Sequence, residues 1–541
     1  MTVLLAIDQG SSSSRCVVLD GELRPLAQAS RPLATFFPAA GWVEHDAGEI
    51  LASVLGAVSD AMGQAAAGWT DVAGIGLAAQ TETFVVWERA TGKAVYPAIS
   101  WRDSRAAGFC DQLRAAGHEA EIRSRTGLPL EAAFSASKLR WLLDEVPGGR
   151  RRAAAGELLF GDVNCWLTWH LTGGAAHVTE PSMAARTMLY DLAASAWDPG
   201  LVDLFGVPAP MLPAVGPTAG RHGVTDPAVC GGRAVIGASI GDQPGALFGQ
   251  RCWRAGMAKL TLGTGAFFWC HAGTSPPAIV PPGVVSSCAW QLDTGSAYAL
   301  EGFVPNAGGV VTWLRQLGVL ADGAWPAIRD GAVLTGAGRD GTGRDGTGRD
   351  GGGGGPATDD GALRGAGGLW CVPAIFGLGT PSWDPAARAD IIGLNAASTA
   401  ADIAEAALLG VVHQVADAVD AVRDGLAGPL ELVRVDGGLG RNDSVLQAIA
   451  DLAAIALERP AVTEATALGA GALAGLGTGL WDLAALERLP FEAGGRVLPG
   501  LAEADRRVAR YRWGAILSRS LAGWQAAGSP AGAGGASGGM P

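Results

Sequence analysis

A carboxylate and a glycine-rich turn lie close together near the middle of the chain. The apolar run from Ala234 to Ile240 predicts a buried strand, and Gly241-Asp242-Gln243 follows it at once. A second apolar run, Met257 to Leu262, leads into Gly263-Thr264-Gly265, where missing side chains let backbone N–H groups approach an anion. This spacing predicts a catalytic base beside a phosphate cradle. The alternative is that Asp242 only caps the helix that follows it.

The N-terminal segment repeats part of this arrangement. Strands are predicted at Val3 to Ile7 and at Cys16 to Leu19, and Asp8-Gln9-Gly10 with four serines joins them. Turns of this composition usually mean only a turn. The strand, the small-residue turn and the apolar continuation recur, however, at Met257 to Trp269. Two similar hairpins, one in each half of the chain, predict two related lobes that face one nucleotide.

A third glycine turn lies in the C-terminal part of the chain. The strand expected at Leu432 to Val435 is followed by Asp436-Gly437-Gly438 and then by Arg441-Asn442-Asp443, which should cap a helix from Ser444. A glycine turn between a strand and a helix N-terminus is a common way to bind a nucleotide. The sequence contains neither a P-loop nor the glycine-rich signature of protein kinases, so a different phosphate-binding fold is expected.

Length and composition predict an α/β protein of at least two domains. The chain has 541 residues, and strand-like segments (74–77 and 84–87) alternate with helical ones (106–116 and 137–145). The formal charge of −13 argues against nucleic acid as a partner. The eight cysteines occur singly, which is typical of reduced thiols in a cytoplasmic protein. The charge-free segment 465–481 is rich in glycine and alanine and predicts an internal helix, not a membrane span.

Two glycine-rich segments interrupt this pattern. Residues of about 336–367 repeat Gly-Arg-Asp-Gly-Thr and then run into five consecutive glycines, and the tail from 526 to 541 has a similar composition. Such segments cannot bury enough apolar surface to offset the entropy of ordering, so both are expected to be disordered. We therefore expect a first domain at 1–250 and a second at 251–525.

The order and spacing of short motifs resemble a known family. The sequence is similar to the FGGY carbohydrate kinases, and among them to the kinases of glycerol, from about Val3 to about Trp524. The motifs are Asp8-Gln9-Gly10, GWVEHD at 41–46, GELLFG at 156–161, RTMLYD at 186–191, GDQ at 241–243, ALFGQ at 246–250, GMAK with GTG at 256–265, WDP at 383–385, VDGG at 435–438 and ERPAVTEATALGA at 458–470.

The resemblance implies two actin-like, ribonuclease-H-like lobes around a central cleft for ATP and substrate. It implies that Asp242 is the general base that takes the proton of the attacking hydroxyl, and that Asp8 and Asp242 hold Mg²⁺ directly or through water. Phosphoryl transfer depends mainly on positioning and charge neutralisation, which these groups would supply. The nucleotide-binding positions implied are Ser11, Ser12, Ser13, Arg15, Thr264, Gly265, Gly308, Gly438 and Asn442.

The implied acceptor site carries two departures from the family pattern. Glu82, Trp101, Asp242, Gln243 and Phe267 match the glycerol pocket, but Thr81 and Ala133 stand where an arginine and a tyrosine are expected. Both changes remove a donor and enlarge the pocket, and each unmade buried hydrogen bond weakens binding by about 1–3 kcal/mol. We expect phosphorylation of glycerol to glycerol 3-phosphate.

Two alternatives to glycerol phosphorylation stay open. A longer polyol or a sugar would fill the space vacated at 81 and 133. A nucleotide-binding regulator that has lost catalysis would use the same frame, although the retention of Asp8, Glu82 and Asp242 favours an enzyme. A homodimer or a homotetramer is compatible with the family resemblance.

Overall fold

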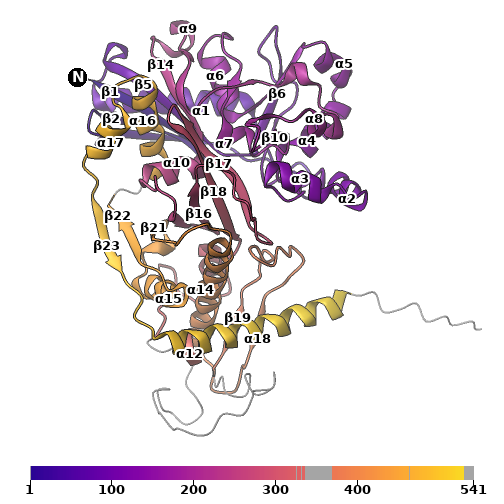
Figure 1. The fold of residues 1–541 in the computed structure, drawn as a ribbon, viewed down its shortest axis with the longest axis vertical. Coiled ribbons are helices and arrows are strands. Elements are labelled where there is room, and N and C mark those ends of the chain that lie inside the picture. Colours follow the sequence, from indigo (N-terminus) through magenta and orange to yellow (C-terminus); the bar gives the residue numbers. More distant parts are fainter. Residues whose placement is uncertain (1, 324–325, 330–331, 336–367, 462–463, 529–541) are drawn as a thin grey trace, which may run out of the picture.

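The computed structural model describes residues 2–323, 326–329, 332–335, 368–461 and 464–528. The glycine-rich insertion expected at about 336–367 lies outside the described residues, as does the tail from 529 onwards. The last helix extends through Gly528, past the expected start of the tail at 526. The chain forms two lobes that lie one above the other (Figure 1).

The first lobe is built on a 6-stranded sheet of order β13-β14-β5-β1-β2-β3. Three strands are parallel (β1, β5 and β14), so their carboxyl ends meet at one edge of the sheet. The antiparallel hairpin predicted at the N-terminus is β1 and β2, and the predicted strand at 234–240 is β14. The strands are β1 Val3–Gln9, β2 Ser13–Asp20, β3 Pro25–Pro32, β5 Val72–Ala79, β13 Ala219–Val224 and β14 Val235–Gly241.

The second lobe repeats this plan in a 7-stranded sheet of order β17-β18-β16-β15-β21-β22-β23. Its hairpin β15–β16 carries Gly263-Thr264-Gly265, and β21 runs parallel to β15. The duplication predicted from the hairpins is confirmed. The strands are β15 Met257–Leu262, β16 Ala266–Gly273, β17 Val285–Leu292, β18 Gly295–Val304, β21 Leu432–Asp436, β22 Leu457–Pro460 and β23 Ala493–Val497.

Helices α10 (Asp242–Gly249) and α16 (Ala465–Gly477) pack against each other between the lobes. Their contact is close because it is lined by glycine: a Cβ atom at Gly469 would overlap the carbonyl oxygen of Gly245. Although α16 belongs to the second half of the sequence, it packs on β1, β5 and β14 of the first lobe, where Figure 1 shows it beside the indigo strands. The charge-free segment is thus an internal helix, as predicted.

The remaining helices pack on the sheets or on one another. α1 begins at the N-cap Asp46, whose side chain accepts from the N–H of Glu49, and its apolar face covers β2 and β3. The first-lobe helices are α1 Ala47–Ala65, α2 Ala107–Ala115, α3 Glu119–Thr126, α4 Ser135–Glu145, α5 Gly149–Ala154, α6 Val163–Leu171, α7 Pro181–Ala184, α8 Pro199–Phe205 and α9 Pro227–Cys230; the others are α11 Gly308–Gln316, α12 Ala332–Thr335, α14 Ala400–Asp424, α15 Asp443–Ala453, α17 Leu483–Arg488 and α18 Glu503–Gly528.

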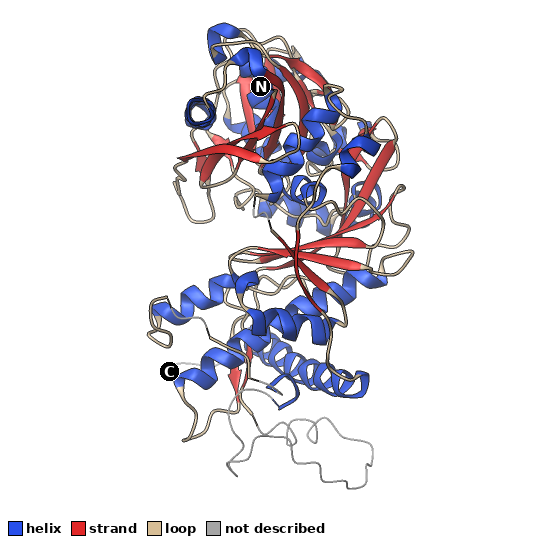
Figure 2. Ribbon diagram, turned by 90° about the vertical axis from the view of Figure 1, so that its left-hand side faces the viewer, coloured by secondary structure: helices blue, strands red, loops and turns tan. Residues whose placement is uncertain are grey.

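Smaller sheets complete the chain, and Figure 2 shows their strands in red beside the two large sheets. A 4-stranded sheet of order β4-β7-β6-β8 extends the first lobe and supports one wall of the cleft between the lobes. Its strands are β4 Glu44–His45, β6 Phe84–Glu88, β7 Ala98–Ile99 and β8 Leu158–Asp162, and the short pairs are β9 Val178–Thr179 with β12 Ala214–Val215, β10 Tyr190–Asp191 with β11 Ala196–Trp197, and β19 Trp370–Val372 with β20 Asp390–Ile392.

Two further findings concern the described residues. All eight cysteines lie in them, and each is a free thiol. No helix among them combines the length and the apolarity that a membrane crossing requires.

Candidate active site

A cavity of about 300 Å³ lies between the lobes and takes its walls from both sheets. The first lobe contributes the residues that follow β5 and β14, and the second contributes residues of β16 and β18. Every acceptor-site residue predicted from the sequence lies in its wall. The lining residues are Ser11, Gln80, Thr81, Glu82, Trp101, Glu131, Ala133, Phe134, Arg186, Asp242, Gln243, Phe267, Val285, Glu301, Phe303 and Trp383.

Asp242 is the first residue of α10, directly after the buried strand β14. Its carboxylate accepts the backbone N–H of Gln243 at 2.8 Å. Burial, and then the charge of Glu82, raise the pKa of Asp242 to about 6. A carboxylate with this pKa is ionised at neutral pH and is a better proton acceptor than an exposed aspartate. Asp242 is therefore equipped as a general base.

Lys259 on β15 fixes the neighbouring Gln243. Its Nζ donates to Oε1 of Gln243 at 2.5 Å and to Oγ1 of Thr261 at 2.8 Å. Lys259 is completely buried, and burial lowers its pKa. Our reading of the sequence did not assign it a role, although a lysine inside an apolar strand is a signal, because a buried cation needs polar partners.

Asp8 lies at the carboxyl end of β1, on the same sheet edge as Asp242. Burial, and then the charge of Asp242, raise the pKa of Asp8 to about 7. The charge of Asp242 thus disfavours the ionised form of Asp8, and a bound cation would offset this repulsion. Among the described residues no group of three or more His, Cys, Asp or Glu side chains could hold a metal ion. The pair fits Mg²⁺, which proteins commonly bind through one or two carboxylates together with phosphate oxygens.

A chain of polar side chains connects the N-terminal hairpin to the acceptor pocket. Oγ of Ser11 donates to Oε1 of Gln80 at 3.1 Å, and Nε1 of Trp101 donates to Oγ of Ser11 at 3.1 Å. Oγ1 of Thr83 also donates to Oε1 of Gln80, at 3.0 Å. Ser11, predicted as a nucleotide-binding residue, therefore lies in the wall of the acceptor cavity and holds the ring of Trp101.

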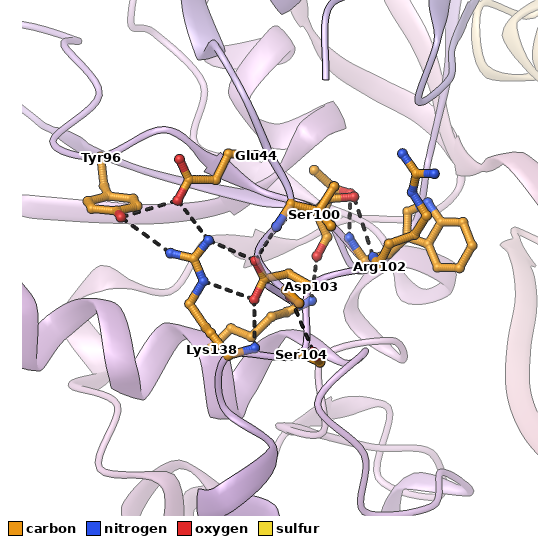
Figure 3. Close-up of polar contacts among 12 residues, drawn as sticks. Glu44, Tyr96, Ser100, Arg102, Asp103, Ser104 and Lys138 are labelled. Atoms are coloured by element: carbon orange, nitrogen blue, oxygen red, sulfur yellow. Dashed lines mark hydrogen bonds and ion pairs between the residues drawn. The ribbon is translucent and has the colours of Figure 1, made fainter. Parts of the chain in front are cut away.

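A buried ionic network includes residues close in sequence to Trp101, and Figure 3 labels its members Glu44 and Asp103 together with the neighbouring Lys138. The guanidinium of Arg105 pairs with Asp103 and Glu44, each at 2.7 Å, and neither Arg105 nor Asp103 exposes its side chain to solvent. Nζ of Lys138 donates to the carbonyl oxygens of Ser100 and Ala133, at 2.9 and 2.6 Å. Lys138 therefore ties together the two segments that supply Trp101 and Ala133.

Glu82 is held by an arginine that our reading of the sequence did not assign to the site. Nε of Arg186 donates to Oε1 of Glu82 at 2.5 Å, and Nη1 donates to Oε2 of Glu301 at 2.9 Å. Glu82 has a φ of 61°, an uncommon conformation for a residue other than glycine. The motif RTMLYD contains Arg186, but nothing local to the sequence indicates its partners, which lie 104 and 115 residues away.

Aromatic rings form the rest of the acceptor pocket. The ring of Phe267 packs against that of Phe303, with centroids 4.8 Å apart, and Trp383 lies beyond Phe303 at 6.5 Å. Thr81 and Ala133 line the pocket with short side chains. Glu131, Phe303 and Trp383 are lining residues that our reading of the sequence did not assign.

The predicted nucleotide-binding residues other than Ser11 are not among the residues that line this cavity. The N–H of Gly308 donates to the carbonyl of Gly263 at 2.8 Å, and a Cβ at Gly308 would lie 2.6 Å from that oxygen. Thr264 and Gly265 form the tip of the β15–β16 hairpin, where glycine at 308 allows the start of α11 to approach.

The other predicted nucleotide positions are distributed over two more segments. Ser12 and Ser13 lie at the tip of the first hairpin, and Arg15 on β2 pairs with Glu464. Gly438 follows β21, which is parallel to β15. Asn442 caps α15, and its Nδ2 donates to the carbonyl of Pro326 at 2.8 Å.

Comparison with known proteins decides the family. The model of the N-terminal domain of the FGGY family of carbohydrate kinases matches residues 3–249, and that of the C-terminal domain matches residues 258–478. The chain belongs to the FGGY family of carbohydrate kinases. It is therefore an enzyme, a kinase that uses a nucleotide as phosphoryl donor, and membership of this family favours catalysis over the alternative of a regulator.

Individual members of the FGGY family are similar over almost the whole chain. A glycerol kinase of Halorhodospira halophila is 41% identical, with 96% of each chain covered. A glycerol kinase of Acidovorax ebreus is 42% identical over 96% of this chain and 99% of the relative. The crystal structure of Plasmodium falciparum glycerol kinase with ADP superposes with a TM-score of 0.82 at 26% identity, and covers 96% of this chain and 98% of that one. The predicted two-lobed fold is confirmed.

Proposed function

We propose that this FGGY kinase transfers the γ-phosphoryl group of ATP to a hydroxyl of glycerol and forms glycerol 3-phosphate. The observation that carries the proposal is the single cavity that collects Glu82, Trp101, Asp242, Gln243 and Phe267. Carboxylate and amide groups suit hydroxyls, while aromatic faces suit a carbon backbone. The relatives named glycerol kinase, at 41 and 42% identity, support the same substrate. A cytoplasmic enzyme that forms a homodimer or homotetramer remains our expectation.

In the proposed mechanism Asp242 accepts the proton of the attacking hydroxyl. The pKa of about 6 leaves it ionised at neutral pH, and its place after β14 directs the carboxylate into the cavity wall. Gln243, held by Lys259, and Glu82, held by Arg186, position the other hydroxyls. The rings of Trp101 and Phe267 exclude water from the carbon side of the acceptor. These contacts fix the hydroxyl for an in-line displacement.

Asp8 and Asp242 would hold Mg²⁺, either directly or through water. The metal ion, when bound, neutralises charge on the phosphates during transfer. The serines of the first hairpin with Arg15, and the turn of Thr264, Gly265 and Gly308, would bind the phosphates through backbone and side-chain donors. Gly438 and Asn442 would lie near the adenosine. The cap that Asn442 forms on α15 and its bond to Pro326 would rigidify that turn.

A longer polyol or a sugar is the second candidate acceptor, and the cavity volume favours it. About 300 Å³ equals the space of about ten water molecules at about 30 Å³ each, more than the six non-hydrogen atoms of glycerol fill. The short side chains of Thr81 and Ala133 line part of this space.

A coupled assay of ADP release across a panel of acceptors tests the proposed function. Glycerol, erythritol, ribitol, xylulose and gluconate are compared by kcat/KM, with an acceptor-free reaction as background. Glycerol should give saturable, acceptor-dependent ADP release. No glycerol-dependent release at tens of millimolar glycerol would contradict the proposal, and a higher kcat/KM for a larger acceptor would support the second candidate.

A further inference from the structure

The acceptor cavity contains more negative than positive side chains. Its described lining includes four carboxylates (Glu82, Glu131, Asp242 and Glu301) and one cation, the guanidinium of Arg186. Arg186 is almost completely buried, with 8% of its side chain exposed. An unpaired guanidinium at such a depth would be costly. The way in which Arg186 is paired therefore matters for what the pocket can bind.

Two of these carboxylates hold Arg186 from opposite lobes. Glu82 precedes β6 of the first lobe, and Glu301 lies on β18 of the second; 9% and 7% of their side chains are exposed. The guanidinium carbon also lies 5.3 Å from the ring centroid of Phe134 and 5.6 Å from that of Trp269. Charge-assisted hydrogen bonds at 2.5 and 2.9 Å, together with these rings, fix the plane of the guanidinium.

The two glutamates do not use the third nitrogen of the Arg186 guanidinium, Nη2. Nε and Nη1 donate to the two glutamates, whereas Nη2 has no hydrogen-bond partner among the described residues. Among the described residues, Nη2 is not one of the fully buried polar atoms that lack a hydrogen-bond partner. Since Nη2 has no partner, it is accessible to solvent. Arg186 is one of the residues that line the cavity. A substrate hydroxyl there would receive a hydrogen bond from an already oriented donor.

We propose that Arg186, which is held between Glu82 and Glu301, orients Glu82 toward the acceptor and donates a hydrogen bond from Nη2 to a neighbouring hydroxyl. Arg186 and Glu82 together then select neutral polyols with adjacent hydroxyls. A donor beside an acceptor matches a diol, because each hydroxyl both donates and accepts. An anionic sugar acid is disfavoured, because the guanidinium is already paired with Glu82 and Glu301, and two further carboxylates, Glu131 and Asp242, line the same cavity. With Thr81 at the position of the expected arginine, Arg186 is the guanidinium that remains in the described lining.

This inference rests on the proposed function, and steady-state kinetics on variants of Arg186 and Glu301 tests it. Arg186→Met removes the donors while keeping a long side chain, Arg186→Lys keeps the charge without the planar fork, and Glu301→Gln removes the charge that anchors Nη1. Arg123→Met is the matched control, because Arg123 bonds the carbonyls of Pro281 and Val284 between the lobes but does not line the cavity. The affinity for ADP, measured by calorimetry, reports on folding and on the nucleotide site.

Arg186→Met should raise the KM for glycerol by at least about thirtyfold, since two hydrogen bonds to the acceptor are weakened, with the affinity for ADP unchanged within about twofold. Arg186→Lys and Glu301→Gln should raise this KM by smaller factors, and Arg123→Met should leave it unchanged. Added ethylguanidinium should restore part of the acceptor affinity to an Arg186→Gly variant, which a purely structural role would not produce. If Arg186→Met does not fold, the KM for glycerol and the affinity for ADP of Arg186→Lys test the inference instead.

Two results would overturn the inference. One is a KM for the acceptor that stays within twofold of wild type in Arg186→Met or Arg186→Lys while ADP still binds. The other is a wild-type enzyme that prefers gluconate to every neutral polyol. A wild type without glycerol-dependent ADP release contradicts glycerol as substrate instead, and the variants are then compared with the neutral polyol that the wild type does use.

Discussion

Asp242 combines a catalytic position with an environment that adjusts its basicity. It begins α10 directly after a buried strand, and burial raises the pKa of its carboxyl group to about 6. The positive end of the α10 dipole and the N–H of Gln243 keep the ionised form accessible. Burial and local donors thus oppose each other at one residue, which is common at functional carboxylates.

The variant Asp242→Asn tests the role of this residue as a base. Turnover should fall by at least about a hundredfold, because the amide cannot accept the hydroxyl proton, while ADP still binds. Steady-state turnover and calorimetry measure the two effects. The matched control is Asp482→Asn, which changes an exposed cap of α17 and should leave turnover unaffected. Near-normal turnover in Asp242→Asn would remove Asp242 from the mechanism.

Thr81 and Ala133 set the width of the pocket at two positions where longer residues were expected. The double variant Thr81→Arg with Ala133→Tyr should tighten glycerol binding by a few kcal/mol at most, because each restored hydrogen bond contributes about 1–3 kcal/mol. Larger acceptors should lose kcat/KM in the same variant because their space is filled. Kinetics with glycerol, erythritol and ribitol checks both effects. Equal changes for all three acceptors would contradict a role of these positions in specificity.

At the scale of elements, the contact between α10 and α16 holds the start of α10 in place. Gly245 and Gly249 on α10 face Gly469 and Ala465 on α16, and a Cβ at Gly469 would overlap the backbone oxygen of Gly245. Backbone atoms cannot move aside as a flexible side chain can. The glycines at this contact are therefore required for the distance between the helices.

The variant Gly469→Ala should separate these helices and displace Asp242. We expect a loss of stability of about 1–3 kcal/mol from overpacking. A fall in kcat of up to about a hundredfold should accompany it if the base moves by about 1 Å. Melting temperature and kcat are measured together. Gly514→Ala is the control, because nothing lies within 4 Å of a Cβ built on this exposed residue of α18. Equal behaviour of both variants would show that the contact tolerates a methyl group.

The packing of α18 on α14 involves a buried histidine. His413 stacks on Trp513 with ring centroids 4.9 Å apart, and neither ring nitrogen has a hydrogen-bond partner among the described residues. Burial, and then Arg510, lower the pKa of His413 well below 6.5. The folded protein therefore keeps the ring neutral at a pH where the unfolded chain binds a proton.

This difference predicts a loss of stability in acid. The contribution of His413 is fully present above pH 6.5 and is lost as the pH falls below 6.5, by up to about 1.4 kcal/mol for each pH unit. In His413→Phe, which keeps the stacking, the fall in melting temperature between pH 7.5 and 5.5 should be smaller than in the wild type. Calorimetric scans at both pH values test this. An unchanged fall would mean that other groups determine the acid sensitivity.

At the scale of the whole molecule, the acceptor should connect the two lobes. The first lobe supplies Glu82 and Asp242 to the cavity, and the second supplies Phe267 and Glu301. A ligand that contacts both lobes binds the folded protein alone. Glycerol at a hundred times its Kd should therefore stabilise the protein by about 2.7 kcal/mol. Thermal unfolding with increasing glycerol measures this effect. 1-Propanol, which lacks adjacent hydroxyls, serves as control, and an equal effect of both alcohols would contradict specific binding.

The sequence by itself determined which strands end at candidate catalytic or phosphate-binding residues. The apolar runs before Asp8, Asp242 and the three glycine turns are local signals, and the strands form where they were expected. Because parallel strands end at a common edge, these local features also predict that Asp8 and Asp242 converge. The family motifs identified most of the acceptor pocket in the same way.

Only the tertiary structure decided which side chains complete the pocket and how they are charged. Arg186 bonds to Glu82 and to Glu301, which lie 104 and 115 residues away in the sequence, and α16 crosses to the sheet of the first lobe. No local periodicity encodes such contacts, because they depend on how separate elements pack. Desolvation has the same origin: the folded chain raises the pKa of Asp8 to about 7 and that of Asp242 to about 6, mainly by removing water from the two carboxyl groups.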